Sequence, residues 1–118
     1  MTLDAFRNHC LLKKGVTEET PFGDDTLVFK VCGKMFAITG IPDFESVNLK
    51  VDPEKGAELR ERYGAVTPGY HMNKKHWITV LNNRSIPDRL LMERITESYR
   101  LVASKLSRRD KLAIGLKD

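Results

Sequence analysis

Short runs with the periodicity of β-strands follow one another through the first half of the chain. Residues 26–31 and 46–51 have apolar side chains at every second position, and residues 34–39 have a similar extended character. Alternation of this kind turns one face of each strand toward a core and leaves the other face polar. Cys32 and Gly33 leave room only for a tight hairpin between the first two strands. The chain is therefore predicted to form an antiparallel sheet.

Three other segments have the spacing of helices that bury one face. Residues 2–13 begin at a capping threonine. Residues 53–63 follow the cap residue Asp52 and have Pro53 in their first turn. The longest helix is predicted over residues 88–106. Its buried stripe consists of Leu91, Ile95, Tyr99, Val102 and Leu106.

The remaining segments complete the order of elements. Residues 15–25 are acidic and rich in turn-forming residues, which predicts a loop, and residues 76–81 return to strand periodicity. The basic tail from Ser107 onward allows a short terminal helix. The predicted order is helix, three strands, helix, one or two strands, helix. Because these helices can cover only one face of an antiparallel sheet, we predict a two-layer α+β sandwich.

Length and composition predict one globular domain over residues 1–118. The chain has 41% hydrophobic and 31% charged residues, as ordinary globular proteins do. No apolar run approaches the roughly 18 residues that span a bilayer, and residues 1–4 lack the features of a signal peptide. We therefore expect a cytoplasmic protein with no membrane association. In that compartment Cys10 and Cys32 are expected to be free thiols.

Positive charge is unevenly placed along the chain. The net charge is only +4, but no Asp or Glu occurs between Arg62 and Pro87. This acid-free window contains two of the three histidines, the single tryptophan and a pair of adjacent lysines. Uncompensated positive charge indicates an anionic partner. Within the window, Pro68 and Gly69 fit a type II turn that would give Gly69 a positive φ.

Metal and catalytic chemistry find little support. His71 and His76 are five residues apart, which puts them on opposite sides of a strand and about 140° apart on a helix. The window offers no cysteine or carboxylate to complete a metal site, and the chain has no G-x-S-x-G sequence and no glycine-rich phosphate loop. We expect no metal, no cofactor and no enzymatic activity. His9, off the buried stripe of the first helix, is expected to be solvated.

Trp77 allows two interpretations. A tryptophan usually packs against neighbouring structure. Here, however, Ile78 takes the core-facing parity of its strand, so Trp77 is expected to be at least partly exposed on the other face. It would lie there beside Lys30, Asn48 and Lys50, forming an aromatic surface that can stack on a base and hold phosphates. The alternative is an exposed tryptophan among ordinary solvated lysines.

The run His71–Trp77, with the sequence HMNKKHW, is long and compositionally unusual. Other distinctive segments are Pro21-Phe22-Gly23, Thr26–Val31, Lys34–Ala37, Val47–Lys50, Pro68-Gly69-Tyr70 and Ser98-Tyr99. Together these segments resemble the MmcQ/YjbR family, and the resemblance extends from the first helix to about Leu106.

The resemblance implies a small cytoplasmic bacterial protein with the order α-β(3)-α-β(2)-α, similar to CyaY-like or secretion-chaperone-like folds. It also implies a DNA-binding role, described for the family as a double-wing motif. The chain departs from the family pattern at one place. Relatives often have Asp-Gly before the last helix, where this chain has Asn83 and Arg84. The change exchanges an acid for a base and favours an anionic partner.

Two functional hypotheses follow. In the first, the protein binds nucleic acid, DNA in particular, with cations on phosphates and other side chains giving hydrogen bonds and stacking. The assigned residues are Lys50, Lys74, Lys75 and Arg84 for phosphates, His71, Asn73, His76 and Trp77 for hydrogen bonds and stacking, and Lys30 and Asn48 in secondary positions. In the second, the sheet face around Trp77 docks a partner protein. Salt separates the two, because phosphate contacts weaken steeply with ionic strength.

Overall fold

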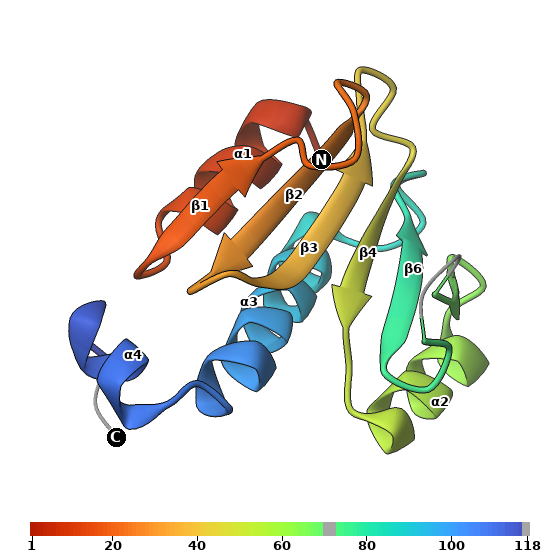
Figure 1. Cartoon of the computed structure of the whole chain (residues 1–118). Helices are drawn as coiled ribbons and strands as arrows, with labels where there is room; N and C mark the ends of the chain where they lie inside the picture. Colours follow the sequence, from red (N-terminus) through yellow and green to blue (C-terminus); the bar gives the residue numbers. More distant parts are fainter. Residues whose placement is uncertain (70–72, 117–118) are drawn as a thin grey trace.

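A six-stranded antiparallel sheet with helices packed against it forms the body of the molecule (Figure 1). The computed structural model describes residues 1–69 and 73–116. The elements are α1 (Leu3–Leu11), β1 (Val16–Glu19), β2 (Thr26–Val31), β3 (Lys34–Gly40), β4 (Ser46–Lys50), α2 (Pro53–Arg62), β5 (Val66–Pro68), β6 (Trp77–Leu81), α3 (Asp88–Ser104) and α4 (Arg108–Ala113). The strand order is β1-β2-β3-β4-β6-β5. The predicted α+β class is confirmed.

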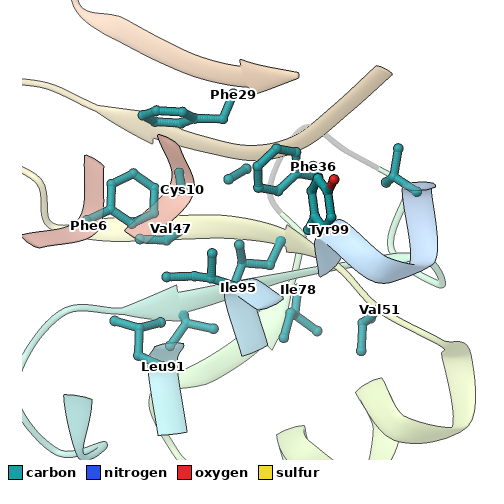
Figure 2. Packing of buried hydrophobic residues seen from close by; sticks show 14 of the residues in the cluster. Phe6, Cys10, Phe29, Phe36, Val47, Val51, Ile78, Leu91, Ile95 and Tyr99 are labelled. Atoms are coloured by element: carbon teal, nitrogen blue, oxygen red, sulfur yellow. The ribbon is translucent and has the colours of Figure 1, made fainter. Parts of the chain in front are cut away.

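The main core lies between the sheet and the helices. In the view of Figure 1, α1 and α3 lie behind the sheet. Figure 2 shows the packed side chains, among which the rings of Phe6 and Phe29 meet edge to face with centroids 5.3 Å apart. Ile95 of α3 and Leu59 of α2 belong to the same buried cluster. The predicted helix stripes are therefore the faces that pack on the sheet.

Local signals account for the helix starts. The side chain of Thr2 accepts a hydrogen bond from the Ala5 amide at the start of α1. Asp52 likewise accepts from the Lys55 amide at the start of α2, where Pro53 occupies the first turn. These side chains satisfy amide groups that have no partner within the helix. Both predicted caps are confirmed.

One strand was absent from the expectation. Residues 16–19, predicted as part of an acidic loop, form β1 at one edge of the sheet. The acidic side chains there are neutralised by two other elements. Arg7 of α1 donates two hydrogen bonds to Glu18, each 2.7 Å long, and Lys30 of β2 lies 3.2 Å from the Glu19 carboxylate. The Thr17 hydroxyl and Lys30 together lower the pKa of Glu19.

A bulge in β3 is fastened by a buried serine of α3. Phe29 pairs with Ala37 and Lys30 pairs with Met35, so Phe36 is an extra residue in the strand. The Ser98 hydroxyl donates to the Phe36 carbonyl at 2.5 Å and accepts from the Lys50 amide at 2.8 Å. A side chain of α3 thus bonds β3 to β4 beside the bulge.

His9 is a structural histidine, contrary to its expected solvation. Its Nε2 lies 3.0 Å from the Met92 carbonyl and 3.0 Å from the Thr96 hydroxyl on α3. Because a carbonyl only accepts, Nε2 carries the proton and donates to Met92. Burial, and then the nearby Lys13 ammonium, lower the pKa of His9. The neutral imidazole therefore ties α1 to α3.

Candidate nucleic-acid interface

One end of the sheet gathers lysines from several separate elements. Lys50, the last residue of β4, pairs with Trp77, the first residue of β6. The Val51 amide donates to the His76 carbonyl at 2.8 Å, which joins the turn before β6 to the end of β4. The β2–β3 hairpin and the C-terminal end of α3 lie at the same end, the lower end in Figure 1. We call this the lysine-rich end. Its members are Lys34, Lys50, Lys74, Lys75 and Lys105.

Trp77 faces away from the helices, as its parity predicts, but the expected exposure is wrong. Only 7% of the residue is exposed. Val28 of β2 and Ile38 of β3, together with Met35, pack with Trp77 in a small apolar cluster on the outer face of the sheet. The ring therefore does not form an open stacking platform. Its place in this cluster also shows that the outer face, expected to be polar, is apolar at its centre.

Lys50 covers part of the tryptophan. Its Nζ atom lies 6.0 Å from the centroid of the Trp77 ring, at the limit of a cation–π contact. Lys50 itself is half-buried, and it makes no ion pair with another described residue. The predicted proximity of these two residues is confirmed. The predicted use of the ring face for stacking is not supported, because the ring is covered.

The turn before β6 presents the lysine pair to solvent. The Asn73 carbonyl accepts from the Trp77 amide at 2.9 Å, and its side-chain oxygen accepts from the Lys75 amide at 2.9 Å. These bonds hold the turn in place, so the side-chain oxygen of Asn73 is already bonded to a backbone amide. Lys74, Lys75 and His76 are exposed. His71, the other histidine assigned to the site, lies outside the described residues.

The predicted turn at Pro68 and Gly69 is wrong in its geometry. Thr67 and Pro68 belong to β5, and Gly69 is not among the glycines with positive φ. A tertiary contact explains the glycine instead. The Gly69 amide donates to the Trp77 carbonyl at 2.9 Å, which brings its backbone directly against the tryptophan.

The two secondary residues are occupied by internal contacts. Lys30 pairs with Glu19, and the Asn48 side-chain oxygen accepts a hydrogen bond from the Thr79 hydroxyl at 2.6 Å. Both lie on the outer face as predicted, Lys30 in β2 and Asn48 in β4. These contacts join neighbouring strands, so the Lys30 ammonium group and the Asn48 side-chain oxygen are already engaged within the sheet.

A groove at the lysine-rich end was not predicted. It has a volume of about 450 Å³, and its lining residues are Lys34, Met35, Lys50, Trp77, Val102, Lys105 and Leu106. Two of its lysines were missed by the sequence reasoning. Lys34 follows the hairpin, where strand parity gave no reason to single it out. Lys105 comes from the end of α3, and only the packing of that helix beside β3 reveals its position.

Arg84 is not brought together with the other predicted cations. It follows β6 at the opposite end of the sheet, the upper end in Figure 1, whereas Lys74 and Lys75 precede the same strand. The neighbouring Asn82 amide donates to the Glu45 carbonyl at 2.8 Å. The loops at that end carry exposed acidic side chains. These are Asp24, Asp25, Asp43 and Glu45.

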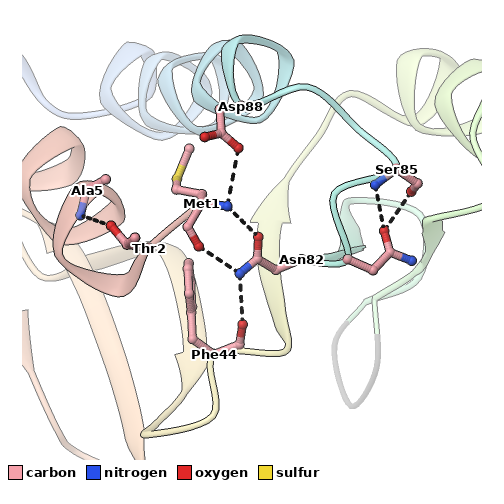
Figure 3. A network of polar contacts seen from close by, with 8 residues as sticks. Met1, Thr2, Ala5, Phe44, Asn82, Ser85 and Asp88 are labelled. Carbon is pink, nitrogen blue, oxygen red and sulfur yellow. Dashed lines mark hydrogen bonds and ion pairs between the residues drawn. The ribbon is translucent and has the colours of Figure 1, made fainter.

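Polar contacts of Asn82 organise this opposite end (Figure 3). Its side-chain amide donates to the carbonyls of Met1 and Phe44, at 3.0 Å and 3.1 Å. Its oxygen accepts from the Met1 amino group, which also lies 3.2 Å from Asp88. The network holds the start of α1, the β3–β4 loop and the start of α3 together. Arg84 lies in the connection between β6 and α3 at this end of the sheet, away from the groove.

The described residues contain few other candidate features. Among residues 1–69 and 73–116, no three His, Cys, Asp or Glu side chains gather in a way that could hold a metal ion. Within the same ranges, none of the helices combines the length and apolar character needed to cross a bilayer. Cys10 and Cys32 are free thiols, and burial raises the pKa of Cys10 to about 12.

Comparison with known proteins gives a consistent family. The YjbR family model matches residues 11–101. The chain is 43% identical over 94 residues to the uncharacterised protein YbdF of Escherichia coli O157:H7, covering 76% of this chain and 75% of that protein. It is 29% identical over 107 residues to the uncharacterised protein YjbR of Escherichia coli K12, covering 90% and 91%.

Solved structures agree with this relationship. The crystal structure of Deinococcus radiodurans protein DR2400, a DUF419 domain, superposes with a TM-score of 0.90 at 43% identity, covering 99% of this chain and 90% of that one. A crystal structure of a Pseudomonas syringae protein superposes with a TM-score of 0.71 at 29% identity, covering 86% and 98%. Both the sequence match and these structures span most of the fold. The chain therefore belongs to the YjbR family.

Proposed function

We propose that the protein binds nucleic acid, DNA in particular, through its lysine-rich end. The observation that carries this proposal is the set of five lysines at that end, none of which makes an ion pair with another described residue. Asp52 is the carboxylate nearest to Lys50 along the chain, and it caps α2. Cations that no carboxylate neutralises are available to phosphates.

The distribution of these lysines favours a polyanion over a small anion. They come from the start of β3, the end of β4, the turn before β6 and the residue after α3. Four of the five are exposed, and Lys50 is half-buried. A single phosphate is held by a few convergent donors, whereas a phosphate backbone is followed by a row of separate cations. The arrangement suits binding, and nothing in it suggests a catalytic group.

The separation of charge along the sheet would orient such a partner. The acidic loops, with Asp24, Asp25, Asp43 and Glu45, lie at the end opposite the lysines. The lysine-rich end also has two exposed carboxylates, Asp52 and Glu54 at the start of α2, so the separation is partial. A polyanion is attracted to the lysines and repelled from the acidic loops. Burial of Trp77 argues against the adaptor hypothesis, because that hypothesis needs an exposed aromatic anchor.

Charge reversal at the turn before β6 tests the proposal. The variant Lys74→Glu with Lys75→Glu should bind a fluorescein-labelled duplex much more weakly than the wild type in anisotropy titrations. Loss of two phosphate contacts should also reduce the slope of log K against log salt by about 1.8. Because both side chains are exposed, thermal melting should be nearly unchanged.

A matched control separates local from overall charge. Arg84→Glu with Arg89→Glu makes the same change in net charge at the opposite end, using two exposed residues. This control should keep wild-type affinity and slope. The proposal is wrong if the wild type fails to bind at low salt, or if the two double variants behave alike.

A further inference from the structure

The groove at the lysine-rich end combines an apolar surface with three cations. Met35, Trp77, Val102 and Leu106 provide the apolar part. Lys34, Lys50 and Lys105 provide the charge, and no carboxylate lines the groove. Four other hollows on the described part of the molecule each include at least one carboxylate. This groove is therefore suited to a ligand that is both anionic and partly apolar.

A phosphate backbone alone would leave this apolar surface unused. Phosphates of a duplex need cations, and the exposed lysines outside the groove already supply them. Bases within a duplex are stacked on each other and cannot enter a hollow without being extruded. A base of a single strand, by contrast, can leave its neighbours at little cost and lie against apolar side chains. The groove volume of about 450 Å³ lies within the range of about 300–1,000 Å³ found for small-ligand sites.

We infer that the groove holds one unstacked nucleotide of a single-stranded segment. This inference rests on the proposed function. The base lies against Met35 and Leu106 and the accessible part of Trp77, and the phosphates on either side contact lysines of the groove. Lys50 already covers the tryptophan ring at 6.0 Å, so the base uses the remaining apolar wall and not the ring face. Single strands are then preferred over duplexes of the same length.

Trp77 provides a direct reporter of an occupied groove. It is the only tryptophan in the chain and it lines the groove. A short oligothymidylate should quench or shift its fluorescence on binding, and a blunt duplex should bind without this change. Thymidine monophosphate has the same base and a phosphate but no neighbouring nucleotides, and it serves as the comparison ligand. It should quench far more weakly, since it lacks the contacts that neighbouring phosphates make with lysines outside the groove.

An uncharged substitution isolates the apolar part of the groove. Met35→Ala should weaken oligothymidylate binding about fivefold, the factor that corresponds to losing about 1 kcal/mol of apolar contact with the base. Its duplex affinity and the salt dependence of its binding should remain those of the wild type. The matched control, Lys74→Gln with Lys75→Gln, lies outside the groove lining. It should weaken both ligands while the quenching at saturation persists.

The experiments distinguish failure of the groove assignment from failure of the proposed nucleic-acid binding. If single strand and duplex bind equally and Trp77 fluorescence stays constant at saturation, the groove assignment is overturned while nucleic-acid binding stands. Equal affinities for thymidine monophosphate and the oligonucleotide overturn the assignment to a strand. Absence of binding to either nucleic acid at low salt overturns both proposals. Thermal melting of each variant shows whether the fold has been kept.

Discussion

A β carbon placed on Gly69 would lie 2.6 Å from the β carbon of Trp77. It would also lie 3.1 Å from the Trp77 carbonyl carbon and oxygen. Real β carbons do not approach other atoms so closely, so any larger residue must push β5 and β6 apart. Gly69 is thus needed for the close approach of two strands, and not for a left-handed turn.

Gly69→Ala should destabilise the protein by about 1–3 kcal/mol, the usual cost of forcing extra atoms into a packed site. Urea unfolding followed by circular dichroism measures the loss, and native Trp77 fluorescence should change because the tryptophan itself must move. Gly64→Ala is the matched control, since a β carbon there has no neighbour within 4 Å. A neutral or stabilising result is expected for Gly64→Ala. Equal effects of the two substitutions would contradict the crowding argument.

The environment of Trp77 shows what the sequence could predict about the site and what it could not. Alternation along β6 correctly put Trp77 and Ile78 on opposite faces. Exposure, however, depends on residues that two strands beyond β4, the neighbour of β6, contribute to the cluster around the ring. Val28 and Ile38 come from β2 and β3, and their proximity follows from a strand order that local periodicity does not encode.

The failure to predict strand β1 has a similar explanation. Residues 16–19 include two adjacent acids, a composition that is unfavourable for a strand. Arg7 and Lys30 neutralise Glu18 and Glu19 from a helix and from the next strand. Long-range partners therefore override the local preference. By contrast, the caps of α1 and α2, the helix stripes and the strands β2, β3, β4 and β6 rest on local patterns, and these were predicted correctly.

Ser98→Ala should cost about 1–3 kcal/mol of unfolding free energy. The Ser98 side chain is fully buried and bonded to the Phe36 carbonyl and the Lys50 amide, so its removal leaves two buried backbone groups without that partner. Ser104→Ala on the same helix is the control. The Ser104 hydroxyl bonds the Leu101 carbonyl at an exposed position, and its loss should cost less than about 0.5 kcal/mol. Chemical denaturation of both variants tests the difference.

His9 should make stability fall as the solution is acidified through the ordinary histidine range. Its folded pKa is lowered, mainly by burial and then by Lys13, so the unfolded chain takes up a proton first as pH falls through about 6.5. The contribution of the neutral side chain is present above this pH and is lost below it. Other charged groups lining the adjacent hollow are Arg89, Glu93, Arg94, Glu97 and Arg100.

A comparison with His9→Gln isolates this effect. The difference in unfolding free energy between wild type and His9→Gln should shrink between about pH 7.5 and about pH 5.5. The exposed His76 is present in both proteins and cancels from the difference. A difference that stays constant over this range would mean that His9 titrates alike in the folded and unfolded states.

Arg84 occupies a position that suits glycine. Its φ is +66°, in the left-handed region, and the Asn83 side-chain oxygen accepts from the Ser85 amide and hydroxyl across it. The arginine therefore keeps the turn at a conformational cost of about 1–2 kcal/mol, which glycine does not incur.

Arg84→Gly should stabilise the fold and leave nucleic-acid binding unchanged. Relief of the left-handed conformation is offset in part by the greater freedom of glycine in the unfolded chain, so a net gain of about 0.5 kcal/mol is expected in urea unfolding. Because Arg84 lies at the end opposite the lysines, the salt slope should equal that of the wild type. Lys74→Gln, the comparison at the lysine-rich end, should lower the slope by about 0.9 for duplex DNA. If Arg84→Gly lowers it by the same amount, the interface extends to both ends of the sheet and its assignment to the lysine-rich end is wrong.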